Sequence, residues 1–155
     1  MAMKRLACEY KQYQQDINSY YILEPTDNML IWNVYIFGPP DSIYDGGMFN
    51  GTLRFTTTYP IEPPQFTIHN LPHPNIYPDG KVCMSILHSN IDITGYEHIS
   101  ERWNPTHSIN SIIMSFITIL VQPNLESPAD IDINKLYIND FKQYKKIIYK
   151  IIANQ

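Results

Sequence analysis

The sequence predicts an α+β fold, in which a small antiparallel sheet is followed by a group of helices. In the first half of the chain, apolar and polar side chains alternate with the two-residue period of a β-strand. In the second half, apolar side chains recur every three to four residues, which is typical of one face of a helix. The 155 residues contain no repeat and no interdomain linker, so we expect a single domain over 1–155.

An amphipathic helix is expected over residues 2–15, and an antiparallel meander should follow it. The apolar side chains of this helix recur at helical spacing: Met3, Leu6, Tyr10 and Tyr13. Four strands are expected at residues 20–23, 30–37, 49–56 and 65–68. The second and third of these alternate most regularly, and turn residues between Gly38 and Gly47 connect them.

Helices are expected after the sheet. The first begins after Thr106 or Ser108 as its N-cap, and Pro123 ends it. Its apolar stripe consists of Ile109, Ile112, Ile113, Phe116, Ile117 and Leu120. A short helix is expected around residues 130–137. The last helix is marked by Phe141, Tyr144, Ile148 and Ile151, with Lys142, Lys145, Lys146 and Lys150 on its solvent side.

Composition excludes several classes of function. The net charge is −4 and no basic stripe stands out, so we expect no nucleic-acid partner. No apolar stretch is long enough to span a bilayer, and no signal peptide is apparent, which favours a cytoplasmic or nuclear location. The two cysteines, Cys8 and Cys83, lie too far apart in the sequence to suggest a disulfide framework, so a reducing compartment is the simpler interpretation.

The most informative stretch is residues 72–88, which read PHPNIYPDGKVCMSILH. Three prolines fix an irregular backbone there, and the Asp79-Gly80 pair turns it. A rigid scaffold that presents one thiol suits nucleophilic chemistry at Cys83. From the residues alone, the alternative of a small buried hydrophobic side chain stays open for Cys83 and applies to Cys8.

Histidines near this stretch raise the question of a metal. The candidate ligands are His69, His73, Cys83 and His88. Their spacing matches none of the compact patterns of zinc ligands, so we expect no metal site. The chain also lacks a phosphate-binding loop.

The 72–88 stretch resembles the active-site segment of the ubiquitin-conjugating enzymes, the E2 family, in which His-Pro-Asn precedes the nucleophilic cysteine. Further motifs match in the same order: Gly38-Pro39-Pro40-Asp41, Tyr44-Asp45-Gly46-Gly47-Met48-Phe49, Tyr59-Pro60-Ile61-Glu62-Pro63-Pro64, Arg102-Trp103-Asn104-Pro105, Pro123-Asn124 and Ser127-Pro128-Ala129. The resemblance covers almost the full chain and implies the UBC fold of that family.

The resemblance also implies roles for residues of the segment. Cys83 would accept ubiquitin from an E1 activating enzyme as a thioester and pass it to a lysine. Asn75 would either stabilise the oxyanion of lysine attack or organise the loop backbone, and both roles stay open. His73 would hold the loop by hydrogen bonds, and His88 would be a structural or supporting residue of the site. Ser127 stands where many E2 enzymes have an aspartate at the gate to the cysteine, and serine is a poor base near neutral pH.

An insertion at about 89–102 separates the cysteine segment from Trp103. It resembles the acidic-loop-insertion E2 enzymes, which include the cell-cycle E2 and the E2 of endoplasmic-reticulum-associated degradation. The shared pieces are Ser85-Ile86-Leu87-His88, Gly95-Tyr96-Glu97 and Glu101-Arg102-Trp103. The subfamily has consecutive acidic residues here, whereas Asp92 is followed by Ile93. Asp92 is the residue expected to act on the acceptor amine, with a merely solvated loop as the alternative.

Partner surfaces follow from the same resemblance. RING-type E3 ligases would bind Arg5, Ile61, Pro105 and Thr106. Ile61 is an apolar side chain in a proline-rich turn, so we expect it to be exposed rather than tucked in as a loop anchor. A platform for the thioester-linked ubiquitin is expected from Asn110, Ser111 and Ser115. We expect a monomer without cofactor, since the E1 consumes the ATP.

Three other functions could share this fold or this cysteine. A non-catalytic ubiquitin-binding scaffold of the same fold would lack the cysteine, whereas Cys83 is present. A cysteine hydrolase would need His88 or His73 directed at the sulfur and a third orienting group, which the spacing does not supply. An E2 for another ubiquitin-like modifier stays open.

Overall fold

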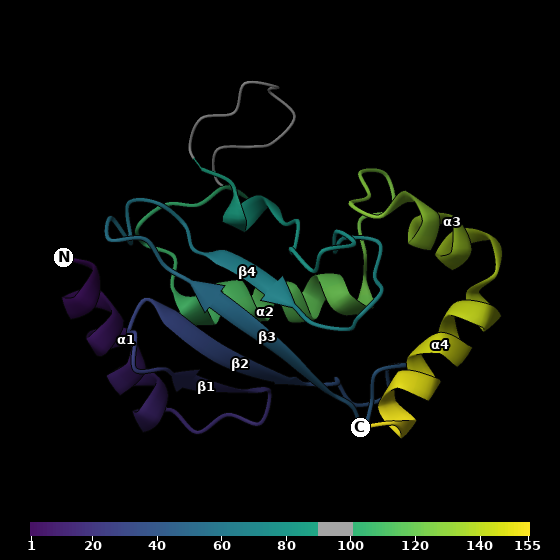
Figure 1. The fold of residues 1–155 in the computed structure, drawn as a ribbon, viewed down its shortest axis with the longest axis horizontal. Coiled ribbons are helices and arrows are strands. Elements are labelled where there is room, and N and C mark those ends of the chain that lie inside the picture. The colour runs from purple at the N-terminus through teal and green to yellow at the C-terminus, as the bar shows by residue number, and fades with distance from the viewer. Residues whose placement is uncertain (90–100) are drawn as a thin grey trace.

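Four antiparallel strands form the centre of the molecule, in the order β1-β2-β3-β4 (Figure 1). The computed structural model describes residues 1–89 and 101–155. The strands are β1 (Tyr21–Pro25), β2 (Ile31–Phe37), β3 (Met48–Arg54) and β4 (Gln65–Ile68). Each strand pairs with the next along the chain, so the predicted four-stranded meander is confirmed.

One face of the sheet forms the core, and helix α2 (Ile109–Val121) covers it (Figure 1). The alternation read from the sequence decides which side chains point inward. In β2 these are Trp32, Val34 and Ile36, all fully buried. Phe66 of β4 meets Phe116 of α2 edge to face, with ring centroids 5.4 Å apart. Packing of this kind fixes α2 behind the strands that lead into the cysteine segment.

Helix α1 (Ala2–Gln15) has the predicted bounds but a different inner face. Met3, which the expected apolar stripe included, is 52% exposed. Glu9 lies inside instead and is only 8% exposed. The reason is specific hydrogen bonding, since a carboxylate can be buried when donors surround it. Apolar periodicity alone could not detect that exchange.

The C-terminal part consists of α3 (Ile131–Asn139) and α4 (Phe141–Ala153), close to the bounds expected from the sequence. Tyr144 and Ile148 of α4 are fully buried. The Tyr144 hydroxyl donates to the carbonyl of Pro72 at 2.9 Å and lies 2.9 Å from the Tyr44 hydroxyl. The first bond attaches α4 to the start of the cysteine segment, and the second attaches it to the loop between β2 and β3.

The order of elements confirms the predicted α+β class and agrees with the UBC fold. Ser108 is the N-cap of α2 and Asp130 is the N-cap of α3. Of the two N-caps proposed for α2, Ser108 is therefore the correct one. Over residues 1–89 and 101–155, the longest apolar helices stay too short to cross a bilayer.

Candidate active site

The segment after β4 is held as a rigid, non-repetitive loop. Ile76 and Val82 form an isolated antiparallel bridge, and the N–H of Tyr77 donates to the carbonyl of Lys81 at 2.8 Å. The N–H of Val82 donates to Phe66 of β4 at 2.9 Å. The segment therefore folds back on itself and joins the sheet edge, so Cys83 follows directly from a fixed backbone.

Asp79 and Gly80 make the turn that the sequence predicted. The Asp79 carboxylate accepts from the N–H of Lys81 at 3.0 Å. Gly80 has a φ of 97°, where residues with a side chain are strained, and an added Cβ would lie 2.7 Å from the carbonyl oxygen of Ile68. The turn thus requires glycine both for conformation and for space.

His73 is fully buried and hydrogen-bonded at both ring nitrogens. Nδ1 accepts from the N–H of Asn75 at 3.0 Å, so Nε2 carries the proton and donates to the carbonyl of Leu120 at 3.1 Å. Burial lowers the pKa of His73 to about 4, so the ring is neutral near pH 7. This arrangement joins the loop to the end of α2.

The Asn75 side chain is buried and pairs with the backbone of Asn124 at both ends. Nδ2 donates to the Asn124 carbonyl at 2.9 Å, and Oδ1 accepts from the Asn124 N–H at 2.8 Å. The Asn75 carbonyl accepts from the N–H of Cys83 at 2.9 Å. Asn75 therefore ties the cysteine to the loop that follows α2.

Cys83 is partly exposed and lines an open cleft of about 320 Å³. The other cysteine, Cys8, is exposed on α1, so the prediction of a small buried side chain is wrong for it, and it is not part of this cleft. The cleft walls come from the 63–66 segment, the 77–82 turn, Leu87 and His88. An acyl group arriving from solvent can therefore reach the thiol. His88, predicted as a supporting residue of the site, also lines this cleft.

Tyr77 is a site residue that the sequence reasoning missed. Its hydroxyl donates to Sγ of Cys83 at 4.0 Å, a long contact typical of sulfur acceptors. The negative charge of a Cys83 thiolate, followed by this hydrogen bond, raises the pKa of Tyr77. The phenol therefore keeps its proton beside the sulfur. Its position two residues after Asn75, on the same turn as the cysteine, was the available signal.

The loop between α2 and α3 is hydrogen-bonded to the cysteine segment on both sides of Ser127. Asn124 pairs with Asn75, and the N–H groups of Ala129 and Asp130 donate to the carbonyl of Pro74 at 2.8 and 3.1 Å. Ser127 is exposed between these two anchors. The structure thus holds the Ser127 loop against the segment that carries Asn75.

The insertion leaves and re-enters the fold beside the cysteine cleft. The N–H of Trp103 donates to the carbonyl of His88 at 3.0 Å, so the two ends are held next to each other. Trp103 is fully buried, and its indole N–H donates to Pro60 at 2.8 Å. Asp92, the predicted acceptor-directing residue, lies outside the described residues.

Of the four residues expected to bind a ligase, Ile61, Pro105 and Thr106 lie on loops, and Arg5 lies on α1. Ile61 is 62% exposed, which confirms the prediction that it does not anchor its loop. Pro105 and Thr106 are also exposed. Arg5 differs, because its guanidinium donates to the carbonyls of Pro105 at 3.0 Å and His107 at 2.7 Å. The guanidinium N–H groups of Arg5 therefore bind carbonyls of the protein's own loop.

The expected ubiquitin platform lies on the first turns of α2. Asn110 is exposed and accepts from the Tyr21 hydroxyl at 2.6 Å. Ser111 belongs to the capping box of the helix, paired with Ser108, and Ser115 is half-buried. Asn110 and Ser111 therefore already make hydrogen bonds within the protein.

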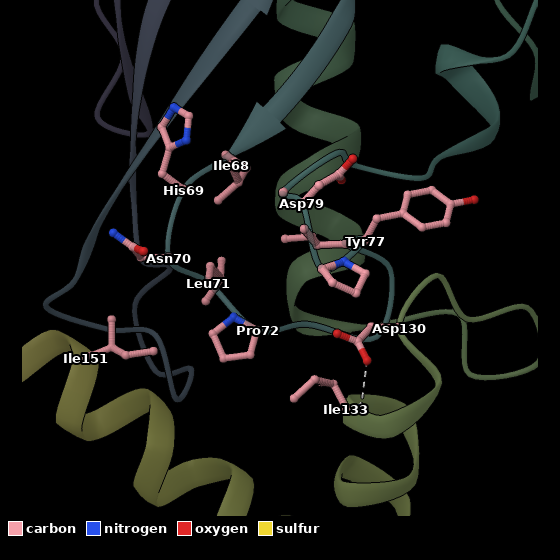
Figure 2. Close-up of a pocket in the computed structure, with 13 residues that line it drawn as sticks. Ile68, His69, Asn70, Leu71, Pro72, Tyr77, Asp79, Asp130, Ile133 and Ile151 are labelled. Atoms are coloured by element: carbon pink, nitrogen blue, oxygen red, sulfur yellow. Dashed lines mark hydrogen bonds between the residues drawn. The ribbon is translucent and has the colours of Figure 1, made fainter.

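A second, larger cleft of about 650 Å³ lies between the end of β4 and the C-terminal helices (Figure 2). Asp79 and Asp130 line it, and one oxygen of each caps a turn or helix. Tyr77 lines both this cleft and the one that contains Cys83. Among the described residues, no group of three or more His, Cys, Asp or Glu could hold a metal ion.

Comparison with known proteins decides the family. A model of the family described as "Ubiquitin-conjugating enzyme" matches residues 5–152. The chain belongs to the ubiquitin-conjugating enzyme family. It is 40% identical to the human ubiquitin-conjugating enzyme E2 G2 over 156 residues, covering 97% of this chain and 94% of that protein. It is 43% identical to ubiquitin-conjugating enzyme E2 14 of Arabidopsis thaliana over 127 residues, covering 81% and 76%.

These matches confirm the predicted identification and its subfamily, since E2 G2 is of the acidic-loop-insertion type. The chain is therefore a ubiquitin-conjugating transferase, and its partners are in general ubiquitin, an activating enzyme and a ligase.

Proposed function

We propose that Cys83 carries ubiquitin as a thioester and delivers it to a lysine amine. The observation that carries this proposal is the position of Cys83, which is partly exposed in a cleft at the end of a rigid turn. Its thiolate would attack the thioester carbonyl on the activating enzyme, and the thiol of that enzyme would leave. A lysine nitrogen would then attack the new thioester and release the Cys83 thiolate.

The residues around Cys83 position these steps. Tyr77 is placed to donate to the sulfur when it is the attacking or the leaving thiolate. The hydrogen bonds between Asn75 and Asn124 support the loop-organising role of Asn75. The second hydrogen on its Nδ2 is proposed to donate to the oxyanion that forms when the lysine attacks. Ser127 and His88 are proposed to orient the incoming amine, because they lie on the two chain segments beside the cysteine.

The partner surfaces are proposed as follows. A RING-type ligase would rest on Ile61, Pro105 and Thr106, which are exposed on adjoining loops. Thioester-linked ubiquitin would lie on the α2 surface around Asn110 and Ser115. The insertion with Asp92 would act on the acceptor lysine. No cofactor is needed at Cys83, since ATP is used by the activating enzyme, and the working unit is a monomer.

A charging experiment tests the proposal. Incubation with activating enzyme, ATP and ubiquitin should give an adduct on a non-reducing gel that a thiol reagent removes. Cys83→Ser should form at most a thiol-resistant oxyester, whereas Cys8→Ser, the matched control, should charge normally. Normal thioester formation by Cys83→Ser would overturn the assignment. The same gel with other ubiquitin-like modifiers tests which modifier is used, and a hydrolase or a scaffold would accumulate no adduct.

A further inference from the structure

A buried carboxylate on α1 has no part in the chemistry proposed for Cys83. Glu9 is 8% exposed, and acidic side chains are rarely buried without several donors. Its Oε1 accepts from the N–H of Ile109 at 2.8 Å, and its Oε2 accepts from Nε of Arg5 at 3.1 Å and from the hydroxyl of Tyr59. The carboxylate therefore joins three separate parts of the chain.

Each of these partners lies next to, or binds, one of the two loops of the proposed ligase surface, which carry Ile61 and Pro105. Tyr59 is fully buried and stands two residues before the exposed Ile61. Ile109 is the first residue of α2, directly after the loop that contains Pro105. A carboxylate at a helix N-terminus is favoured by the helix dipole and by the unpaired N–H groups there. Glu9 thus fixes where both loops leave the core.

Arg5 extends the network to the loop surface itself. Its Nη1 and Nη2 donate to the carbonyls of Pro105 and His107, and its guanidinium lies 5.8 Å from the centre of the Tyr59 ring. The bond from Nε to Glu9 fixes the rotation of the guanidinium plane, which directs the other two nitrogens at the loop. Burial, followed by the bond to Glu9, raises the pKa of Tyr59, so this hydroxyl stays a donor.

We propose that Glu9 is a positioning residue for ligase binding, which holds the loops around Ile61 and Pro105 in one conformation through Arg5 and Tyr59. The inference rests on the proposed ligase surface. A surface that is ordered before binding loses less conformational entropy when a partner docks. Arg5 then acts mainly by shaping its own chain, rather than by offering its charge to the ligase.

The test uses Glu9→Gln, which keeps the shape and one acceptor but removes the charge that orients Arg5. The probe is a RING domain first shown to accelerate lysine discharge from the wild-type thioester. Binding of this RING domain should weaken by about fivefold or more, in line with the effect of an interface residue worth over 1 kcal/mol. The ratio of stimulated to unstimulated discharge should fall for the same variant. Glu24→Gln, an exposed acid on β1, is the control and should match wild type.

Two further measurements separate positioning from general destabilisation. In ¹H–¹⁵N spectra of the folded Glu9→Gln protein, the signals of Ile61, Thr106 and His107 should shift, because their loops lose a fixed partner. Tyr59→Phe, which removes only one hydroxyl, should weaken RING binding in the same direction. If Glu9→Gln cannot be folded, Tyr59→Phe carries the test alone.

A double-mutant cycle tests whether Glu9 affects RING binding through Arg5. Because Glu9 acts largely through Arg5, the loss in Arg5→Ala/Glu9→Gln should be clearly smaller than the product of the two single losses. Losses that multiply, or wild-type RING affinity in both Glu9→Gln and Tyr59→Phe, would overturn the inference. If the wild-type protein charges with ubiquitin but no RING domain accelerates its discharge, the proposed ligase surface has failed instead.

Discussion

At the scale of single residues, the site depends on buried side chains that hydrogen-bond to the backbone of other segments. His73 and Asn75 are both buried, and both use backbone partners from α2 or the loop after it. Residues of this kind fix the shape of the cysteine segment before any substrate arrives. Their substitution should therefore change stability and catalysis by different amounts, which can be measured separately.

His73 should make folding sensitive to acid. Its folded pKa of about 4 lies below the 6.5 of an ordinary histidine, so the unfolded chain binds a proton that the folded one does not. The stabilisation is complete above pH 6.5 and is lost as pH falls towards 4. From pH 7 to 4.5 this group should cost about 2–3 kcal/mol of the free energy of unfolding.

Urea denaturation at several pH values measures this loss. The variant His73→Gln should be less stable at pH 7 but should lose less stability on acidification than wild type. The exposed His69 provides the control, because His69→Gln should keep the wild-type pH dependence. An unchanged pH dependence in His73→Gln would show that His73 is not the group responsible.

Asn75→Ala should separate loop organisation from oxyanion stabilisation. It removes both bonds to Asn124 and should lower the free energy of unfolding by about 1–3 kcal/mol, because buried backbone groups lose their partner. If the amide also serves the oxyanion, lysine discharge should slow about a hundredfold or more while charging persists. Single-turnover discharge of the purified thioester is the measurement. Equal discharge rates in folded variant and wild type would leave only the loop-organising role.

At the scale of elements, α2, α3 and α4 each begin at a residue whose side chain caps the helix. Ser108 and Ser111 form a reciprocal capping box on α2, and Asp130 caps α3. The apolar face of α2 lies against the sheet. Near the other end of the helix, the carbonyl of Leu120 accepts a hydrogen bond from His73. A small change at the start of α2 therefore affects an element that supports the cysteine segment at its other end.

Ser108→Ala should lower the free energy of unfolding by about 1 kcal/mol, since the N-cap loses its acceptor for the helix N–H groups. Thermal or urea denaturation at pH 7 measures the effect. Ser115→Ala is a matched substitution in the interior of the same helix and should change stability little. A loss in Ser115→Ala as large as that in Ser108→Ala would contradict the role given to the cap.

At the scale of the whole molecule, segments that are distant in sequence converge on Cys83. The loop after α2 binds Pro74 and Asn75, and α4 binds Pro72. The ends of the insertion are joined by the bond between His88 and Trp103. Because these ends already meet, shortening the insertion should leave the rest of the fold in place.

The insertion is expected to govern acceptor use rather than charging. Deleting residues 90–96, or making Asp92→Ala, should preserve thioester formation but reduce transfer to lysine, because an acidic group near the sulfur can orient a cationic amine. Chain building should suffer more than transfer to free lysine, since a folded acceptor must also be oriented. Asp27→Ala, an exposed acid in the turn before β2, is the control.

Discharge assays with free lysine and with ubiquitin as acceptors test this role of the insertion. A deletion variant that charges and discharges like wild type on free lysine and on ubiquitin would show that the insertion is only a spacer. Salt should reduce the effect of Asp92 if its charge acts through solvent.

The sequence by itself determined the fold class, the four strands, the helices and the family. These follow from periodicity, from glycine and proline at turns, and from motifs such as the 72–88 stretch, all of which are local properties. Asp79 and Gly80 illustrate this, because the pair predicted the turn at which Gly80 has its positive φ.

Only the tertiary structure decided the partners of buried polar groups. The exchange of Met3 for Glu9 on the inner face of α1, the pairing of Asn75 with Asn124, and the approach of Tyr77 to Cys83 depend on which segments meet in space. The physical reason is that a polar side chain can be buried wherever long-range donors or acceptors satisfy it, and no local pattern in the sequence encodes such partners.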